Sequence, residues 1–268
     1  MKTLFMLSVT SDIGLFIAKS FSALGYSILG TYRDEFAGKQ IMKENKKFDL
    51  IKCDISKPQD IKNLELELKK RNCRWNMAIF CPAQPYPYKN FFQSDFTEWE
   101  TSFNNNATNQ LKVLHTIHAF RCDLSTCIFF SSLGINVPVA AFSAYMTAKI
   151  HLLKMVEVLD FENLDMKFSI VGPGWVNTKG QLHALEKCAE TDERYILTKK
   201  FLDENGGTDM EDIFELIKWI SDSGKEIVGG RNFSLVHDPW RAPSRDKLER
   251  ALKNDPNLYK LRRRESLD

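Results

Sequence analysis

The chain has 268 residues, of which 43% are hydrophobic and 27% are charged. This length and composition are sufficient for a globular core, in one large domain or two small ones. The 37 Lys and Arg residues and 35 Asp and Glu residues give a formal charge of +2. So balanced a charge argues against a nucleic-acid-binding surface.

The apolar first nine residues are too short to span a membrane, and they lead into Thr10 and Ser11 without the cleavage site of a signal peptide. We interpret them as a first β-strand. The six cysteines form no CxxC pair, so neither a zinc site nor a disulfide framework is indicated. We expect no metal site, no membrane attachment and a reducing, cytoplasmic location.

Short apolar segments alternate with longer segments of helical period. The expected strands are 3–9, 26–32, 48–53, 76–80, 125–132 and 167–172, and the expected helices between them are 14–24, 35–46, 57–71, 97–120 and 143–160. Repeated strand–helix–strand order indicates a parallel sheet covered on both faces. We therefore predict a doubly wound α/β fold of the Rossmann type, in a single domain over residues 1–240.

Two segments extend this pattern. Residues 175–210 are helical in pattern and follow the sixth strand, at the edge where open α/β sheets bind ligands. We predict a substrate lid there, the alternative being a surface helix pair without a binding role. Residues 241–268 form a charged C-terminal extension, with leucines that predict a docking helix ending before Pro256. We expect it to dock near the substrate entrance, on its own fold or a neighbouring subunit, with its terminal basic cluster exposed; the alternative is a frayed tail.

The segment SVTSDIG, residues 8–14, joins the first strand to the first helix. A dinucleotide pyrophosphate would meet backbone N–H groups and a helix N-terminus there. Glycines are usual at such a turn because side chains keep the backbone away from the phosphates. Only Gly14 is present here, with Ser8 and Asp12 at the other two places, so the turn alone is a weak signal. Asp12 has a second interpretation, as the N-cap of the helix.

Tyr145 and Lys149 lie one helical turn apart in the segment SAYMTAK, so they share a helix face. A nearby ammonium lowers the pKa of a tyrosine. The pair is therefore one route to a proton donor that works near neutral pH. The same spacing also occurs by chance on ordinary solvated helices, so other features must support it.

Together, the turn, the element order and the YxxxK spacing resemble the short-chain dehydrogenase/reductase family over residues 3–238. The family's TGxxxGxG pattern falls on residues 7–14, where only its last glycine is kept. A count of seven from Trp99 selects Asn106 over its two neighbouring asparagines, and the spacing to Tyr145 selects Ser132 over Ser131. The resemblance implies four catalytic residues: Asn106, Ser132, Tyr145 and Lys149.

The resemblance also implies a cofactor site. Asp54, after the third strand, would hydrogen-bond the adenine amino group, although it is equally readable as the start of a turn. The segment CPAQ stands where the family has NNAG, and GPGWVNT resembles the family's PGxxxT, which places Thr178 beside the nicotinamide carboxamide. The expected cofactor contacts are Ser8, Thr10, Ser11, Asp12, Ile13, Gly14, Tyr32, Arg33, Asp54, Ile55, Pro82, Ala83, Tyr145, Lys149, Pro173, Gly174, Val176 and Thr178.

The chemistry of these side chains suggests their roles. Tyr145 donates a proton to a carbonyl oxygen as a hydride arrives at carbon, and Ser132 holds that oxygen. Lys149 keeps the phenol pKa low and binds the ribose hydroxyls. By the family's pattern, Asn106 holds a water that links Lys149 to solvent. The nicotinamide supplies the hydride.

The end of the second strand, GTYRDE, bears on the choice of nicotinamide. Enzymes that use NAD place an acidic group there for the ribose, whereas an arginine accommodates the 2′-phosphate of NADP. Tyr32 occupies the acidic position and Arg33 the next, so NADP(H) is favoured. NAD(H) stays open because Asp34 is one residue further on.

We therefore expect an oxidoreductase acting on a small carbonyl or secondary alcohol, with a non-catalytic nucleotide-binding protein of the same fold as the alternative. Residues 83–95, 133–144 and 175–210 would form the substrate pocket and contain no readable code. The TSDIG variant resembles bacterial members and suggests a sugar-related metabolite of a surface-glycan pathway. We expect a homodimer or homotetramer formed by helices 97–120 and 143–160, with candidate contacts at Leu111, Leu114, Leu152, Met155 and Val156.

Overall fold

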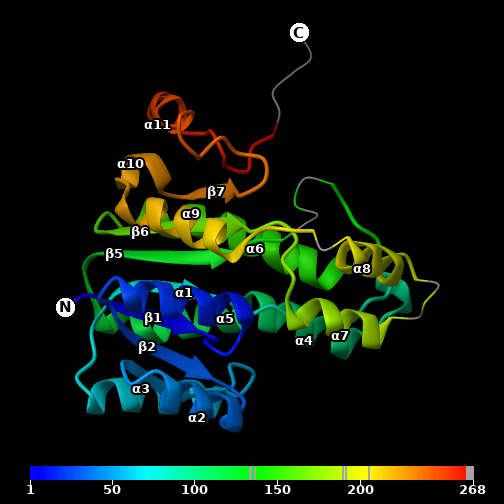
Figure 1. Cartoon of the computed structure of the whole chain (residues 1–268), viewed down its shortest axis with the longest axis horizontal. Coiled ribbons are helices and arrows are strands. Elements are labelled where there is room, and N and C mark those ends of the chain that lie inside the picture. The colour runs from blue at the N-terminus through cyan, green and yellow to red at the C-terminus, as the bar shows by residue number, and fades with distance from the viewer. Residues whose placement is uncertain (133–134, 136, 189, 191, 205, 264–268) are drawn as a thin grey trace.

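The computed structural model describes all residues except 133–134, 136, 189, 191, 205 and 264–268. Its centre is a parallel sheet of seven strands in the order β3-β2-β1-β4-β5-β6-β7 (Figure 1). The strands are β1 Thr3–Leu7, β2 Ser27–Tyr32, β3 Phe48–Lys52, β4 Trp75–Phe80, β5 Arg121–Phe130, β6 Met166–Gly172 and β7 Arg231–Ser234. The doubly wound α/β fold expected from the sequence is confirmed.

Helices cover both faces of this sheet, each over its own apolar core. One core is built under α1 Asp12–Ala23, α2 Glu35–Glu44, α9 Met210–Asp222, α10 Lys225–Val228 and α11 Arg245–Asn254. The other lies under α3 Pro58–Lys70, α5 Thr108–Ile117 and α6 Ser143–Glu162. The remaining helices are α4 Phe96–Asn106, α7 Lys179–Lys187, α8 Glu193–Asp203 and the short turns η1 Phe91–Gln93 and η2 His118–Phe120. No helix among the described residues is long and apolar enough to cross a membrane.

The structure differs from the sequence-based expectations at several places, among them an additional strand, β7. The helix expected at 97–120 is broken at Ala107, whose φ of −135° and ψ of −78° lie outside the helical region. Helix α1 begins at Asp12, two residues before the expected range 14–24, with Ser11 and not Asp12 as its N-cap. Helix α9 was not predicted, although its buried Ile213, Leu216, Ile217 and Ile220 follow helical spacing.

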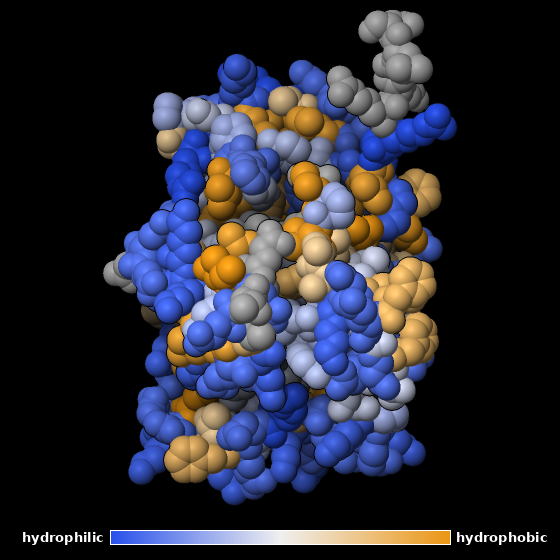
Figure 2. Space-filling view, turned by 90° about the vertical axis from the view of Figure 1, so that its right-hand side faces the viewer, coloured by the Kyte–Doolittle hydropathy of each residue, from blue (hydrophilic) through white to orange (hydrophobic). Residues whose placement is uncertain are grey.

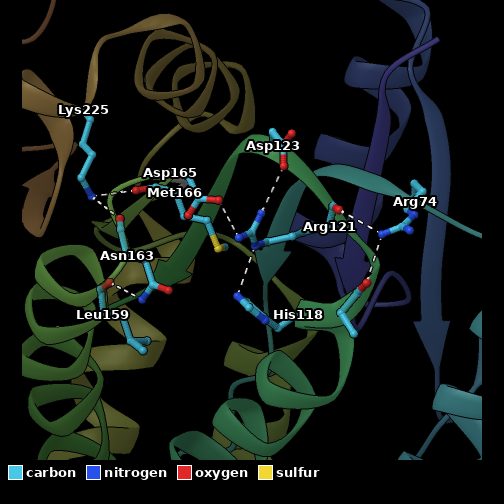
Figure 3. A network of polar contacts seen from close by, with 10 residues as sticks. Arg74, His118, Arg121, Asp123, Leu159, Asn163, Asp165, Met166 and Lys225 are labelled. Carbon is cyan, nitrogen blue, oxygen red and sulfur yellow. Dashed lines mark hydrogen bonds and ion pairs between the residues drawn. The ribbon is translucent and has the colours of Figure 1, made fainter.

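Polar contacts hold together the amino ends of the central strands (Figure 3). The guanidinium of Arg121, at the start of β5, donates to Asp165 Oδ2 at 2.6 Å and to His118 Nε2 at 3.2 Å. Lys225 Nζ donates to the carbonyl oxygens of Met166 and Asn163 at 2.7 and 3.1 Å, just after helix α6 ends. These contacts stabilise the amino ends of the strands. A ligand would bind at the opposite, carboxyl ends.

The C-terminal extension docks on its own fold, beside β7. The buried guanidinium of Arg231 donates to the carbonyl oxygens of Leu252 at 2.6 Å and Leu258 at 2.9 Å, and the N–H of Asn232 donates to Tyr259 O at 2.9 Å. Helix α11 ends before Pro256, as predicted. It packs against α10, away from α7 and α8, the helices of the expected lid (Figure 1). The described part of the extension thus covers the edge strand β7, and its expected place near the substrate entrance stays a prediction. Residues 264–268 of the expected basic end lie outside the described residues.

Candidate nucleotide-binding and active site

The strand order reverses at β1, which lies between β2 and β4. In open α/β sheets ligands bind outside the carboxyl ends of the strands at such a switch point. The loops that leave β1, β4, β5 and β6 there contain most of the site residues expected from the sequence. Figure 2 looks onto this end of the molecule and shows apolar patches within a mainly hydrophilic surface.

The turn after β1, residues 8–14, is compact. Ser11 Oγ donates to Ser8 O at 2.9 Å and accepts the N–H of Gly14 at 3.1 Å. A Cβ added at Gly14 would lie 2.7 Å from Ser8 O, so the one glycine that the chain keeps is required by this close approach. Ser8 adopts a φ of 67°, while Thr10 and Ile13 are half-buried beside it.

Asp12 points from this turn to the beginning of helix α7. Its Oδ2 accepts the backbone N–H of Lys179 at 2.7 Å, and its Oδ1 lies 3.4 Å from Lys179 Nζ. The sequence analysis missed this contact, because nothing in the local pattern links residues so far apart.

The end of β2 offers a cation and no available carboxylate. Asp34 is the N-cap of α2, and its Oδ1 accepts the N–H of Ala37 at 2.7 Å. Tyr32 is buried, and a Cβ at Gly38 would lie 2.4 Å from its ring. Arg33 is exposed and makes no hydrogen bond or ion pair within the described part of the chain. Its guanidinium is therefore the group available to a phosphate.

Asp54 follows β3, next to the half-buried Ile55. Asp54 Oδ1 accepts from both the N–H and the hydroxyl of Ser56, at 3.1 and 2.7 Å. Its pKa is lowered although burial opposes the shift, because these Ser56 bonds and the nearby Arg33 charge outweigh burial. Asp54 thus forms a turn with one oxygen, and its Oδ2 makes no hydrogen bond within the described residues.

Asn106 fastens the segment after β4. Its Oδ1 accepts the N–H of Gln84 at 2.8 Å and its Nδ2 donates to Gln84 O at 2.7 Å. One turn later, Gln110 Nε2 donates to Asn106 O at 3.0 Å and to Pro82 O at 3.2 Å. The sequence analysis missed Gln110, although its i+4 spacing from Asn106 was a signal. Pro82 is half-buried and Ala83 exposed in this segment.

Lys149 is buried beneath the active-site end of α6, with a relative exposure of 1%. Its Nζ donates to Pro82 O at 3.3 Å and lies 5.6 Å from the centroid of the Tyr145 ring. Burial lowers the pKa of Lys149 to about 8, against a small opposing effect of Cys81. The expected i,i+4 pair therefore does not lie on a solvated helix face: one member is in the interior.

Tyr145 is half-buried, and its ring lies 6.4 Å from that of Phe142. Phe142 in turn lies 5.5 Å from Tyr88, in the loop after β4. The ring of Phe142 is therefore close to both tyrosine rings. Ser131 is buried, with its hydroxyl 3.3 Å from Asn232 Oδ1, whereas Ser132 is half-buried at the end of the strand. Residues 133–134 and 136, part of the expected pocket, lie outside the described residues.

The loop after β6 completes the site. Gly174 has a φ of +75°, and a Cβ there would lie 2.7 Å from Val236 Cγ2. Trp175 O accepts the N–H of Thr208 at 2.7 Å, and the Trp175 ring lies 4.9 Å from that of Phe201 in α8. Pro173 is half-buried, Val176 is buried, and Thr178 precedes the first residue of α7. Residues 189, 191 and 205 of the expected lid lie outside the described residues.

These residues fit a nicotinamide dinucleotide. The tight turn after β1 leads into helix α1 at the switch point, where a pyrophosphate can meet backbone N–H groups. The exposed Arg33 follows β2, and the buried ammonium of Lys149 lies near the Tyr145 ring. Among the described residues, no group of three or more His, Cys, Asp or Glu side chains is placed to hold a metal ion.

Known proteins share this fold. A short-chain dehydrogenase/reductase from Saccharomyces cerevisiae superposes with a TM-score of 0.80 at 19% identity, over 89% of this chain and 97% of that one. A short-chain dehydrogenase from Shigella flexneri, complexed with NADP, has a TM-score of 0.74 at 15% identity, over 87% of this chain and 96% of that one.

Sequence comparison gives the family. A 3-ketodihydrosphingosine reductase of Candida glabrata is 25% identical over 178 residues, which are 66% of this chain and 47% of that relative. The chain thus matches less than half the length of this relative. A family model described as enoyl-(acyl carrier protein) reductase matches residues 9–234. The chain therefore belongs to the short-chain dehydrogenase/reductase family of oxidoreductases.

Proposed function

We propose that the protein is an NADP(H)-dependent oxidoreductase that interconverts a carbonyl compound and a secondary alcohol. The observation that carries this proposal is the burial of Lys149 directly beneath Tyr145. Burying an ammonium without an ionic partner costs folding free energy, so its presence calls for a functional reason. Support for a tyrosine that must transfer a proton is such a reason.

The proton chemistry follows from this placement. The Lys149 ammonium favours the phenolate form of Tyr145, so the tyrosine can release a proton to a carbonyl oxygen and accept one back in the reverse reaction. Ser132 would hold the same oxygen by a hydrogen bond. The bound nicotinamide would supply the hydride to the carbonyl carbon. Asn106 bonds to Gln84 in the CPAQ segment, residues 81–84. We propose that these bonds position the Pro82 carbonyl, which accepts from Lys149.

The end of β2 supports NADP(H) over NAD(H). The Asp34 carboxylate, one residue beyond Arg33, is engaged as a helix N-cap. Arg33 is exposed next to it, and an arginine there suits the 2′-phosphate. Asp54, Gly14 and Thr178 would contact the adenine, the pyrophosphate and the nicotinamide, respectively.

The aromatic side chains near Tyr145 indicate the general class of small-molecule substrate. The aromatic rings of Phe142 and Tyr88 near Tyr145, with Trp175 and Phe201 at the lid, suit a substrate with an apolar or ring portion. Two classes are therefore worth comparing: an acyl or aromatic ketone, and a sugar-related ketone. A panel with both, assayed by loss of NADPH absorbance, would distinguish them.

A non-catalytic nucleotide-binding protein is the second candidate, favoured by Asp12 at a place where glycine is usual. Titration of NADPH fluorescence followed by the carbonyl panel separates the two functions. Binding with turnover that Tyr145→Phe abolishes supports the enzyme; binding without turnover of any carbonyl supports the alternative; no binding of either nicotinamide contradicts both.

We also propose a homodimer or homotetramer in the cytoplasm. Of the apolar side chains expected at the interface, Leu114, Leu152 and Val156 are buried in the core of the single chain, so they are not available to a partner. Exposed aromatic side chains of the same region, Phe92 and Phe96, are better candidates. Light scattering at micromolar concentration tests the assembly.

A further inference from the structure

The turn after β1 and the first lid helix meet through one side chain. Asp12, the first residue of α1, accepts the backbone N–H of Lys179 at 2.7 Å, and its second oxygen lies 3.4 Å from Lys179 Nζ. The two residues are 167 positions apart in the chain. The contact therefore joins the first residues of helices α1 and α7, beside the proposed cofactor site.

Asp12 supplies a cap that α7 lacks locally. The first N–H groups of an α-helix have no partner within the helix, and the local N-cap, Thr178, makes no side-chain capping hydrogen bond. The Asp12 carboxylate takes the N–H of the first residue of α7, where the helix dipole also favours a negative charge. The start of α7 is therefore held by a residue of the nucleotide turn.

The same carboxylate lies at the N-terminus of α1, in the turn where a dinucleotide pyrophosphate would bind. A pyrophosphate carries negative charge and seeks the same kind of N–H groups. Like charges close together repel, and more strongly near a protein surface than in water. A pyrophosphate bound at this turn would therefore repel the Asp12 carboxylate in its observed position.

We propose that Asp12 is a positioning residue that holds the start of α7 against the nucleotide turn in the free protein, and that a bound dinucleotide breaks this contact. The proposal rests on the proposed use of NADP(H). It gives Asp12 a role at a position where a glycine would leave the start of α7 without this cap. The start of the lid would then respond directly to cofactor binding.

Amide hydrogen exchange of the peptide 179–187 tests the hold on α7 without any substrate or cofactor. Loss of a cap in Asp12→Gly should speed exchange in the first turn by roughly tenfold, the effect of about 1.4 kcal/mol. Asp12→Asn, which keeps an acceptor, should change it less. Asp95→Gly removes the N-cap of α4 and should leave 179–187 unchanged. Unaltered exchange in Asp12→Gly would overturn the proposal.

Titration of NADPH fluorescence tests whether the dinucleotide breaks this contact. Both Asp12→Gly and Asp12→Asn remove the negative charge, so each should bind NADPH at least about threefold more tightly than the natural chain, and the gain should shrink at high salt. Equal or weaker binding in both variants would refute this effect. If the natural chain and the variants bind no dinucleotide, the proposed function fails, and hydrogen exchange alone decides whether Asp12 holds α7.

Discussion

Lys149 Nζ and the carbonyl oxygen of Pro82 lie 3.3 Å apart, so the end of β4 holds the buried ammonium in place under Tyr145. In the proposed function this arrangement supports proton transfer, and burial of the ammonium costs folding stability. Burial lowers the pKa of Lys149 from 10.5 to about 8, which means that the charged form is less stable in the folded chain than in the unfolded one.

We therefore expect Lys149→Met to stabilise the fold at pH 7 while abolishing activity. The shift of the pKa corresponds to about 3 kcal/mol, reduced by the lost Pro82 bond. Because the folded-state pKa is the lower one, the penalty is fully present below pH 8 and disappears as the pH rises to 10.5. Urea unfolding at pH 7 and pH 10 measures the difference.

The exposed Lys19 is the matched control, and Lys19→Met should leave stability unchanged at both pH values. A Lys149→Met variant that is less stable than the natural chain at every pH would show that the buried ammonium contributes to stability.

Arg33 should decide the choice of cofactor. Arg33→Ala removes the one guanidinium near the expected 2′-phosphate, so NADPH binding should weaken at least about tenfold, the size of a charge-assisted hydrogen bond, while NADH binding changes little. Fluorescence titration with each nicotinamide gives both constants.

Asp34→Ala serves as the comparison for Arg33→Ala. It removes the N-cap of α2 and should lower stability by about 1 kcal/mol without altering the NADPH to NADH ratio. Equal losses of NADPH and NADH in Arg33→Ala would mean that this side chain does not meet the 2′-phosphate.

The sequence predicted the fold well because its signals are local. Apolar segments such as 76–80 and 167–172 are bounded by turns, and their alternation with helices leaves few topologies. The break at Ala107 was not predictable in this way: its cause is tertiary, since Asn106 bonds to Gln84 on another loop.

Site residues that lie close in the sequence could be predicted to lie together, as for Tyr145 and Lys149, which are four residues apart on one helix. Contacts between distant loops were not. Asp12 was readable as an N-cap, and the structure shows that it caps a helix, but that helix is α7 and not α1. Docking of the extension beside β7 also depends on Arg231, whose burial no local pattern indicates.

Asn106 should prove essential to the fold of the CPAQ segment. Asn106→Ala leaves the Gln84 N–H and carbonyl without their partner, at a cost of about 3 kcal/mol. Turnover should fall with it, because Pro82 no longer holds Lys149. Asn104, two residues earlier on the same helix, makes no side-chain hydrogen bond within the described residues, so Asn104→Ala should change stability by less than about 0.5 kcal/mol. Thermal unfolding of both variants makes the comparison, and equal melting temperatures would refute this role of Asn106.

Deletion of residues 242–268 should lower stability more than it affects the site. It removes the carbonyl acceptors of the buried Arg231 guanidinium and uncovers the core beneath Leu248 and Leu252, a loss of several kcal/mol. Removal of 264–268 alone keeps all of these contacts and is the control. The urea midpoint should fall sharply only for the longer deletion. An unchanged midpoint, with altered substrate affinity, would instead place the extension at the substrate entrance.

The consumption of NADPH by the natural chain and by Tyr145→Phe, with the same carbonyl substrate, tests the central claim most directly. The phenylalanine keeps the ring that lies over Lys149 and removes only the hydroxyl, so fold and NADPH affinity should be retained. Turnover should fall by at least about a hundredfold, the usual effect of removing a general acid. Full activity in Tyr145→Phe would contradict the proposed proton transfer and the function that rests on it.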